Sequence, residues 1–255
     1  MKKKEYELKI ENLTKNYSSG KKIKKKVFDS LSMEFESGKI HCILGVSGCG
    51  KSTLLRIIAG LEDIEKGKII FKNELNTNNN IFISMVLQEN NLLPWLTVYQ
   101  NIKFAVDSCG KNIEKSYIDE VLKKHNLLEY KDFYPFELSV GLKQKVSLCK
   151  AIITKPKVVL LDEPFCALDF VSKENIHDIF LNEFSKERFT SILSTHYLDE
   201  AVKLGDYIHL LGKGNKYIKI RNPLKYPREK DANYHKFLEK IKHLYIRSEE
   251  NVYTY

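Results

Sequence analysis

The sequence predicts an α/β fold in which a mostly parallel sheet is flanked by helices. Short apolar runs alternate with segments of helical spacing along the 255-residue chain, a pattern typical of parallel strands joined by helical crossovers. Two regions depart from it: strand-like alternation without helices near the N-terminus, and a long helical stretch between two strand–helix groups. We therefore expect an N-terminal antiparallel β subdomain and an inserted helical subdomain at about residues 88–153.

The N-terminal region supplies the first strands. Residues 6–35 alternate in places between apolar and polar side chains and are broken by Ser18-Ser19-Gly20, as expected for paired strands and a turn. Residues 39–44 form a short apolar run that leads directly into a glycine-rich loop, which predicts a buried strand. From Ser52 the apolar residues recur at helical spacing, and we expect that helix to be stopped by Gly67.

Beyond residue 72 the alternation of strands and helices resumes. Residues 73–80 are a polar connector, and the helical stretch is broken at Pro94 and near Pro135. Strands are expected at residues 81–87, 157–161 and 190–194, helices at 172–187 and 198–204, and a closing hairpin at 207–220. We divide the chain into a main domain, residues 1–222, and a helical tail, residues 223–255, with Asp231 as a plausible helix cap. Six residues share one face of the tail helix: Tyr234, Phe237, Leu238, Ile241, Leu244 and Tyr245.

The composition favours a cytosolic globular protein. Apolar residues make up 43% of the chain, but no stretch approaches the roughly 18–20 apolar residues of a membrane span. The start, Met1-Lys2-Lys3-Lys4, leads into a strand pattern rather than an apolar segment, so no secretory signal is expected. The five cysteines form no Cys-x-x-Cys pair, which favours reduced, mostly buried thiols over disulfides or a zinc site. They are Cys42, Cys49, Cys109, Cys149 and Cys166.

The chain is basic, with a net charge of +9 from 42 basic and 33 acidic residues. This balance is compatible with nucleic acid or an anionic membrane face as a partner. Much of the excess lies in two lysine-rich segments, residues 2–4 and 21–26. Because no aromatic residues for base stacking are interleaved with these lysines, a solvated hairpin tip is favoured over a nucleic-acid patch.

The strongest chemical signal is an octapeptide between an expected strand and an expected helix. Its glycines let the backbone curl so that amide groups point at phosphate oxygens. Lys51 can reach the β- and γ-phosphates of a nucleotide, and Ser52 can ligate Mg²⁺. A chance glycine-rich loop is the alternative, but the strand–loop–helix setting favours nucleotide binding. The octapeptide is Gly45-Val46-Ser47-Gly48-Cys49-Gly50-Lys51-Ser52.

A second signal is the acidic pair Asp162-Glu163 at the end of the apolar run 158–161. A buried strand delivers such carboxylates to the edge of the sheet where α/β proteins bind ligands. Asp162 suits Mg²⁺ coordination through water, and Glu163 can polarise a water for attack on the γ-phosphate. A helix-capping role explains the pair equally well when it is taken alone, but its position about 110 residues after the glycine-rich loop favours catalysis.

Further motifs resemble the ATP-binding subunits of ABC transporters, from about residue 5 to residue 215. Taken alone, Gln88 and His196 are more typical of surface or capping residues, and Tyr17 of strand packing. Six motifs in the order of the family favour the functional interpretation. They are Tyr17 in the N-terminal strands, the glycine-rich loop, Gln88 behind a strand, Leu138-Ser139-Val140-Gly141 before a basic, amide-rich helix, the acidic pair with Ala167-Leu168-Asp169 behind it, and Thr195-His196 behind another strand.

The resemblance implies a P-loop NTPase (RecA-like) fold that binds ATP and Mg²⁺. It implies that Glu163 activates water, that His196 contacts the γ-phosphate and that Gln88 senses the metal and the water. The implied catalytic residues are Lys51, Gln88, Glu163 and His196, and the implied metal-binding residues are Ser52, Gln88 and Asp162. The implied nucleotide-binding residues are Tyr17, Gly45, Val46, Ser47, Gly48, Cys49, Gly50, Lys51, Ser52, Thr53, Ser139, Gly141 and Asp169.

The resemblance also implies partners. A second copy of the chain, or a paralogous ATPase subunit, would cover the nucleotide with Ser139 and Gly141 of its own signature loop. An integral membrane permease would be the direct target, with a solute-binding protein as an indirect partner and no direct contact with nucleic acid. The implied location is the cytoplasm, peripheral on the inner face of the cell membrane. The resemblance implies that other subunits select the transported solute, so the sequence of this chain does not identify it.

One position departs from the family pattern, because Val140 stands where the signature usually has glycine. A β-branched residue strongly disfavours a positive φ, so the backbone at Val140 must stay in the α or β region. Ser139 and Gly141, which resemble the phosphate-contacting positions, are intact. Our hypothesis is an active ATPase that Val140 slows.

A finer similarity concerns the stretch at residues 87–98, which resembles importers of nitrate, taurine, aliphatic sulfonates and thiamine precursors. Residues 162–169 and 196–201 point to the same branch, whereas the proline-glycine hairpin common near its end is replaced by residues 212–216. Leu92, Leu93 and Trp95 either form part of a groove for a short permease helix, or Trp95 fills the core of the helical subdomain.

Two alternative functions follow from the same residues. A soluble ABC-type ATPase acting on nucleic acid or ribosomes is disfavoured, because such proteins usually carry two ATPase units or a long inserted coiled coil. A non-catalytic regulatory module is disfavoured by the intact Lys51, Glu163 and His196.

Overall fold

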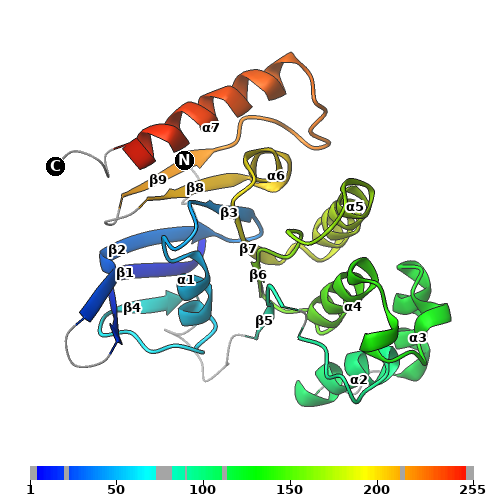
Figure 1. The fold of residues 1–255 in the computed structure, drawn as a ribbon. Helices are drawn as coiled ribbons and strands as arrows, with labels where there is room; N and C mark the ends of the chain where they lie inside the picture. The colour runs from blue at the N-terminus through cyan, green and yellow to red at the C-terminus, as the bar shows by residue number, and fades with distance from the viewer. Residues whose placement is uncertain are drawn as a thin grey trace. The chain divides into compact units, whose positions relative to one another are not determined.

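The computed structural model describes residues 5–19, 23–72, 82–89, 91–110, 114–212 and 216–250 (Figure 1). The chain divides into two compact units. The first comprises Met1–Ile81 and Thr190–Tyr255, and the second comprises Phe82–Phe189. Residues 2–4, 21 and 22 of the lysine-rich segments and the connector at 73–80 lie outside the described residues.

The first unit contains the predicted antiparallel sheet. Strands β1 (Tyr6–Ser19), β2 (Ile23–Glu36) and β4 (Lys66–Phe71) pair in the order β2-β1-β4, with both pairings antiparallel. Leu8 and Ile10 on β1 and Met33 and Phe35 on β2 are buried. Since alternate residues of a strand face the same side, these spacings bury one face of the sheet, as the sequence predicts.

The helix expected to end at Gly67 is shorter than predicted. Helix α1 (Lys51–Ile58) ends in a Schellman motif, in which Gly60 has a φ of 72° and the amide of Leu61 donates to Arg56 O at 2.8 Å. Gly67 lies instead inside β4, a strand that the sequence analysis missed. Its neighbour Lys68 forms an ion pair with Glu11 of β1 at 3.1 Å.

The first unit also contains a parallel group of strands. Strand β3 (Ile40–Leu44) pairs in parallel with β7 (Thr190–Thr195) on one side and with β8 (Tyr207–Leu211) on the other. Strand β9 (Tyr217–Arg221) adds to β8 in an antiparallel sense, which confirms the predicted closing hairpin. Every residue of β3, β7 and β8 is buried, which explains why β3 and β8 are mainly apolar in sequence; the Ser and Thr residues of β7 are buried as well.

Two buried histidines connect these strands. His41 of β3 contacts the carbonyl oxygen of Glu36 through Nε2 at 3.0 Å, and its Nδ1 lies 2.9 Å from Nε2 of His209 on β8. Nδ1 of His209 in turn lies 2.9 Å from the hydroxyl of Tyr217. A carbonyl oxygen can only accept, so His41 carries its proton on Nε2, His209 donates from Nε2, and Tyr217 donates to His209.

This histidine relay (Tyr217, His209, His41 and the Glu36 carbonyl) holds both imidazoles neutral. Burial away from water lowers the pKa of His41 to about 4 and lowers the pKa of His209 well below its usual value. The side chains of Tyr207 and Lys219 also surround the pair: Tyr207 stacks on His41 with ring centroids 5.2 Å apart, and Lys219 disfavours further positive charge.

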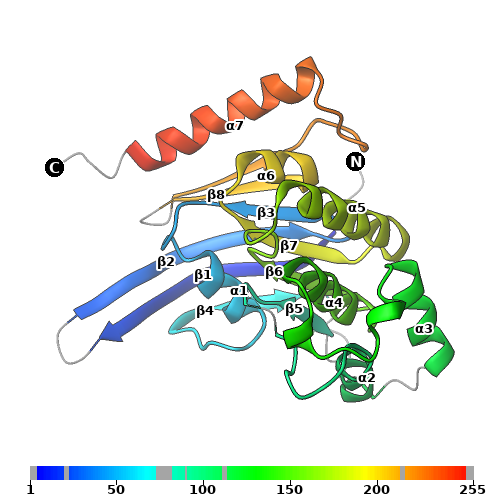
Figure 2. The ribbon, with the colours of Figure 1, turned by 45° about the vertical axis from the view of Figure 1, so that its right-hand side comes forward.

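The C-terminal tail packs on the first unit. Helix α7 (Ala232–Glu250) begins where Asp231 accepts a hydrogen bond from the amide of Tyr234 at 2.8 Å, which confirms Asp231 as its cap. Figures 1 and 2 show α7 beside β8 and the short helix α6 (Leu198–Leu204). The predicted apolar face is confirmed. Tyr234, Phe237 and Ile241 are buried, and Leu238, Leu244 and Tyr245 are partly buried.

The second unit combines two parallel strands with helices. Strands β5 (Ile83–Val86) and β6 (Val158–Asp162) pair in parallel, with Val86 opposite Leu161. Its helices are α2 (Val98–Ser108), α3 (Lys115–Lys124), α4 (Val140–Ile152) and α5 (Phe170–Glu187), with 3₁₀ turns at Leu128–Tyr130 and Pro135–Glu137. The helical breaks expected at Pro94 and Pro135 coincide with the start of α2 and the second 3₁₀ turn.

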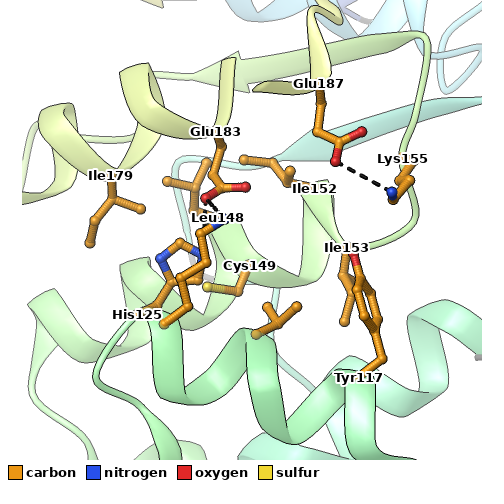
Figure 3. A pocket seen from close by; sticks show the side chains of 12 residues that line it. Tyr117, His125, Leu148, Cys149, Ile152, Ile153, Lys155, Ile179, Glu183 and Glu187 are labelled. Carbon is orange, nitrogen blue, oxygen red and sulfur yellow. Dashed lines mark ion pairs between the residues drawn. The ribbon is translucent and has the colours of Figure 1, made fainter. Parts of the chain in front are cut away.

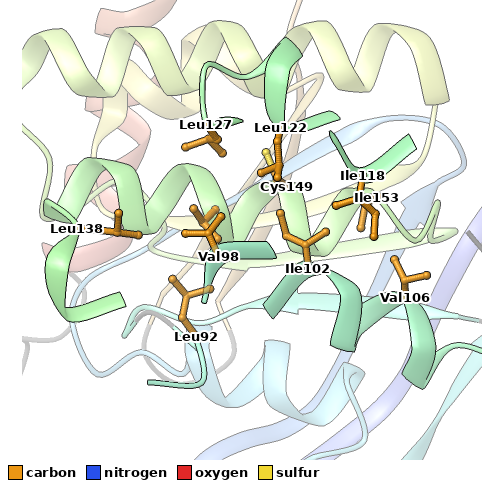
Figure 4. Packing of buried hydrophobic residues seen from close by; sticks show 11 residues of the cluster. Leu92, Val98, Ile102, Val106, Ile118, Leu122, Leu127, Leu138, Cys149 and Ile153 are labelled. Carbon is orange, nitrogen blue, oxygen red and sulfur yellow. The ribbon is translucent and has the colours of Figure 1, made fainter. Parts of the chain in front are cut away.

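The helical part of this unit has a hydrophobic core of its own (Figure 4). Apolar side chains from α2, α3 and α4 meet in it, among them Val98, Ile102, Leu122 and Cys149. Leu92 belongs to this core, whereas Trp95 is 69% exposed. The interpretation of Trp95 as a core residue is therefore wrong, because its indole projects into solvent. The predicted helical subdomain is confirmed as a feature of the fold.

A small cavity between α3, α4 and α5 is lined by an ion pair whose carboxylate is buried and whose lysine is exposed (Figure 3). Glu183 of α5 pairs with Lys124 at the end of α3, and its Oε1 lies 3.5 Å from Nε2 of His125. Burial lowers the pKa of His125, which keeps this imidazole neutral beside the pair. One turn further along α5, Glu187 pairs with Lys155 at 3.4 Å in a more exposed position.

Glu183 and Glu187 allow the effect of burial on an ion pair to be tested with matched variants. We expect Glu183→Gln to lower the free energy of unfolding by about 1–3 kcal/mol, because it leaves Lys124 without its anion in a partly buried site. Glu187→Gln is expected to cost less than about 1 kcal/mol, as for exposed pairs. Urea unfolding of both variants measures the difference, and equal losses would contradict a structural role for the buried pair.

Candidate functional site

The glycine-rich loop follows β3 and leads into α1, as predicted. Gly50 has a φ of 109°, and a Cβ at this position would lie 2.7 Å from the ring of Phe28, so only glycine fits. Lys51 is buried at the start of α1, and its Nζ donates to the carbonyl oxygens of Gly45 at 2.8 Å and Val46 at 3.4 Å. The ammonium group therefore lies within the curl of the loop.

The start of α1 has the properties of a phosphate site. Its N-cap residue is Gly50, so no side chain caps the first turn, and that turn contains no acidic residue. The amide groups at a helix N-terminus attract anions, and here Lys51 adds a full positive charge. Ser52 and Thr53 follow in the same turn. These residues fit the phosphates of a nucleotide.

His196 lies near the same edge of the first unit. It follows β7, whose last residue, Thr195, is paired in register with Leu44 at the end of β3. The glycine-rich loop and His196 therefore leave adjacent parallel strands at their carboxyl ends, where α/β sheets bind ligands. His196 is exposed, and its ring packs against Tyr197 with centroids 4.0 Å apart.

Tyr17 of β1 is also close to α1. Its hydroxyl lies 3.3 Å from Oγ1 of Thr53 and donates to the carboxylate of Glu62. Burial and the adjacent Glu62 raise the pKa of Tyr17. The ring is partly exposed, with Nζ of Lys15 5.1 Å from its centroid. Sequence reasoning missed Glu62, whose contact with Tyr17 depends on how the turn after α1 meets the sheet.

In the second unit the structure brings Gln88, Asp162 and Glu163 to one edge. Gln88 follows β5 and Asp162 ends β6, and these strands are parallel neighbours. Asp162 is buried and Gln88 is exposed. Glu163 has a φ of 45°, a conformation that costs a non-glycine residue about 1–2 kcal/mol. Backbone strain of this kind is concentrated at functional sites.

Ser139, Gly141 and Asp169 lie together at the starts of two helices in the same unit. Ser139 is the N-cap of α4 and accepts a hydrogen bond from the amide of Leu142 at 3.3 Å. Asp169 is the N-cap of α5 and accepts from the amide of Ser172 at 3.0 Å. Hydrogen bonds from Ser172 hold the pKa of Asp169 below its usual value. A Cβ at Gly141 would lie 3.5 Å from Oγ of Ser172, a neighbour that sequence reasoning missed.

Val140 adopts a helical conformation as the first residue of α4. This agrees with the expectation that a β-branched residue avoids positive φ, and it leaves the backbone of the signature loop unstrained. The side chain is 49% exposed, between Ser139 and Gly141. Any effect of Val140 on turnover must therefore come from its isopropyl group at the surface rather than from a distorted loop.

We expect Val140→Gly to raise ATP turnover about fivefold, which corresponds to about 1 kcal/mol of transition-state stabilisation. Removing the exposed isopropyl group lets a nucleotide approach Ser139 and Gly141 more closely. Steady-state hydrolysis by the variant and the wild type measures the change. Unchanged turnover, with an unchanged melting temperature, would show that Val140 does not slow the enzyme.

The implied site residues thus fall into three groups. The first unit brings together Tyr17, the glycine-rich loop with Lys51, Ser52 and Thr53, and His196. The second unit brings Gln88, Asp162 and Glu163 to one edge, and Ser139, Gly141 and Asp169 to two helix starts. No helix in the described part of the chain combines the length and apolar character needed to cross a bilayer.

Comparisons with known proteins show to which family the chain is similar. A family model described as "ABC transporter" matches residues 28–166. The chain is 37% identical over 211 residues to the aliphatic sulfonates import ATP-binding protein of Bacillus subtilis, covering 81% of this chain and 82% of that protein. It is 34% identical over 232 residues to an uncharacterized ABC transporter ATP-binding protein of Methanocaldococcus jannaschii, covering 88% and 85%.

A solved structure is also similar. It is a dimeric ATP-binding cassette in a post-hydrolysis state, bound to ADP and phosphate. The TM-score is 0.73 at 26% sequence identity, and the match covers 86% of this chain and 100% of that one.

Proposed function

The chain belongs to the ABC transporter family, and from this premise we infer that it is the ATP-hydrolysing subunit of a membrane importer of a small solute. It binds ATP, and hydrolysis is coupled to transport. The observation that carries this conclusion is the strand–loop–helix at residues 40–58, in which Lys51 lies buried within the curl of the loop. That arrangement offers a positive charge and helix-terminal amides to a triphosphate.

We propose that hydrolysis depends on positioning and charge stabilisation by the residues of the motifs. Lys51 offsets phosphate charge, and Glu163 accepts a proton from the attacking water. The strained backbone at Glu163 supports this role, because such strain is retained where a side chain must be aimed. His196 contacts the γ-phosphate, Gln88 senses the metal and the water, and the Tyr17 ring stacks on the base.

Ser52, Asp162 and Gln88 would hold Mg²⁺. The ion supplies positive charge that neutralises the phosphate oxygens as the terminal phosphate leaves. Hydroxyl and carboxylate oxygens are ligands that Mg²⁺ prefers, and it usually keeps several waters beside one or two protein ligands and the substrate phosphates. The buried carboxylate of Asp162 at the end of β6 fits such an arrangement.

A second copy of the chain, or a paralogous subunit, is proposed to complete each nucleotide site. Ser139 and Gly141 would bind the γ-phosphate of the partner's nucleotide, with Asp169 nearby. An exposed apolar surface surrounds these residues, because Val140, Phe170 and Val171 begin α4 and α5 with side chains in solvent. Exposed apolar groups beside the phosphate-binding positions support a protein contact here.

The permease is proposed to bind an aromatic surface of the helical subdomain, defined by Trp95, Phe133, Tyr134 and Phe136. All four side chains are exposed. Backbone hydrogen bonds from Val98 to Phe133 O at 2.9 Å and from Tyr99 to Lys131 O at 2.9 Å hold the two segments side by side. Aromatic residues are enriched in protein interfaces, and a short permease helix is the proposed occupant. Sequence reasoning identified only Trp95 of this group.

We propose that the chain works on the inner face of the cell membrane, with a solute-binding protein as an indirect partner. The similarity to aliphatic sulfonate importers supports a small organic anion as the solute. An ATPase acting on nucleic acid is disfavoured, because the relatives reported above include an import ATP-binding protein.

Affinity purification from native membranes tests this function. We expect an integral membrane permease to be recovered with the wild-type chain, and much less of it with Trp95→Ala. Phe104→Ala is the matched control, because Phe104 is an exposed aromatic on α2 outside the proposed surface. Recovery of the chain without any membrane protein would contradict the importer assignment.

A further inference from the structure

Helix α6 follows the proposed γ-phosphate contact, His196, after a single residue. It spans only seven residues, Leu198–Leu204. A helix this short is marginal by itself and depends on outside contacts. Its last carbonyl groups also lack partners within the helix and must be satisfied elsewhere. The source of those contacts therefore bears on how firmly His196 is held.

Residues from the C-terminal region supply most of them. Nδ2 of Asn222 donates to Val202 O at 2.8 Å and to Gly205 O at 2.9 Å. Nη1 of Arg228 donates to Lys203 O at 2.9 Å, and the hydroxyl of Tyr226 donates to Leu204 O. Three consecutive carbonyls at the end of α6 thus accept hydrogen bonds from side chains 20 to 25 residues further along the chain.

The first turn of α6 is held in the same way. Tyr234, fully buried on α7, donates from its hydroxyl to the Asp199 carboxylate at 2.8 Å, and the same hydroxyl lies 2.9 Å from the backbone oxygen of Asp199. Nζ of Lys230 donates to that carboxylate at 2.9 Å. Hydrogen bonds from Lys230 and Tyr234 keep the pKa of Asp199 below its usual value despite burial, so the carboxylate stays charged.

Arg228 and Tyr226 are themselves firmly placed. The guanidinium of Arg228 lies 3.7 Å from the centre of the Tyr226 ring and forms an ion pair with Asp206 at 3.2 Å. Both contacts fix the rotamers that reach α6, and Figure 2 shows α7 alongside α6. The tail is therefore attached to α6 by specific hydrogen bonds and ion pairs as well as by apolar packing.

We propose that the α6 clamp, formed by Asn222, Tyr226, Arg228, Lys230 and Tyr234, sets the position of His196 for ATP turnover. The proposal rests on the proposed function, since it gives His196 its role at the γ-phosphate. Asp199 and Tyr234 act as positioning residues: they hold the first turn of α6 three residues beyond His196. None of the clamp residues is among the proposed nucleotide contacts.

Tyr234→Phe tests the clamp in the full-length chain. The variant removes one hydroxyl from a buried ring, and we expect kcat to fall about tenfold with an unchanged KM for ATP, as misplacement of a catalytic group does. Ile241→Val is the matched control: it loosens the same face of α7 without touching Asp199. We expect it to lower the melting temperature of the chain but not kcat.

A second pair of variants compares the ion pair between Lys230 and Asp199 with an ion pair that lies within α7. Lys230→Ala removes the pair with Asp199, whereas Lys242→Ala removes a pair with Glu239 within α7 at 3.4 Å. We expect only the first to lower kcat, by about twofold, since the pair is half exposed.

Equal kcat values for Tyr234→Phe and the wild type would overturn the positioning role alone. The same conclusion would follow if kcat fell in step with the melting temperature to the same extent in Tyr234→Phe and Ile241→Val. A wild-type chain whose ATP hydrolysis does not depend on Glu163 would instead overturn the proposed function, and this inference with it.

Discussion

Replacing Glu163 by glutamine is expected to lower ATP turnover by about 10²–10⁴-fold while ATP still binds, since a general base contributes on this scale. The amide keeps the size of the side chain but does not take a proton from water. Lys51 and the start of α1 are unchanged, so the nucleotide is retained. Dimers with trapped ATP should therefore accumulate, and size-exclusion chromatography with nucleotide analysis measures them alongside steady-state hydrolysis.

Asp178→Asn provides the control for this variant. Asp178 is an exposed acidic residue on α5, away from the edge of β6, so its neutralisation should leave turnover unchanged. Turnover in Glu163→Gln close to that of the wild type would defeat the assignment of Glu163 as the base. Loss of ATP binding in the same variant would indicate a structural role instead.

Acidification is expected to destabilise the protein through the histidine relay. In the unfolded chain both imidazoles titrate near a pKa of 6.5, whereas in the folded chain the pKa of His41 is about 4 and burial holds that of His209 well below 6.5. Below pH 6.5 the unfolded state therefore binds more protons, and the free energy of unfolding falls as the pH falls. Stability from the relay is fully present above pH 6.5 and is lost progressively towards pH 4 for His41.

The expected loss from His41 between pH 8 and pH 5 is about 2 kcal/mol, and His209 adds to this loss. Urea unfolding at the two pH values measures it. His209→Gln removes one titrating group while retaining a donor and an acceptor, so the variant should lose less stability on acidification than the wild type. The same slope in the variant and the wild type would show that the relay does not govern acid stability.

Much of the fold was predictable because its strands are buried in characteristic ways. Residues of β3, β6, β7 and β8 are buried, and all of these strands except β7, which contains four Ser and Thr residues, are mainly apolar, as is typical of parallel strands. The cap of α7 at Asp231 was predictable because the capping residue and the helical pattern that follows it are adjacent in the sequence. The same holds for the glycine-rich loop, whose chemistry is encoded within eight consecutive positions.

Strand β4 was not predictable by such local patterns. Only Phe71 is fully buried in it, and Lys66, Gly67 and Lys68 are exposed, so no apolar alternation marks it. Its pairing with β1, including the ion pair between Lys68 and Glu11, stabilises the strand from more than 50 residues away in the chain. The helix that begins at Lys51 ends before Gly60. Tertiary contacts with β1, rather than a local pattern, determine the strand at residues 66–71.

Within the candidate site, the residues proposed to carry chemistry could be identified from the sequence, and the neighbours proposed to position them could not. Lys51, Asp162 and Glu163 belong to short motifs in defined settings. The neighbours of other site residues are distant from them in the sequence: Glu62 lies beside Tyr17, and Ser172 lies beside Gly141. The residues of the α6 clamp are likewise distant in sequence from α6. Hydrogen bonds such as Arg228 to Lys203 O depend on the final packing of α7 and leave no periodic signal.

The dependence of ATP turnover on chain concentration tests the central claim most directly, because each nucleotide site is proposed to need Ser139 and Gly141 from a second subunit. We expect turnover per chain to rise with concentration and to level off once sedimentation shows that dimers predominate. Ser139→Ala should lower the plateau. Constant turnover per chain down to concentrations at which only monomers sediment would contradict a site completed by a partner.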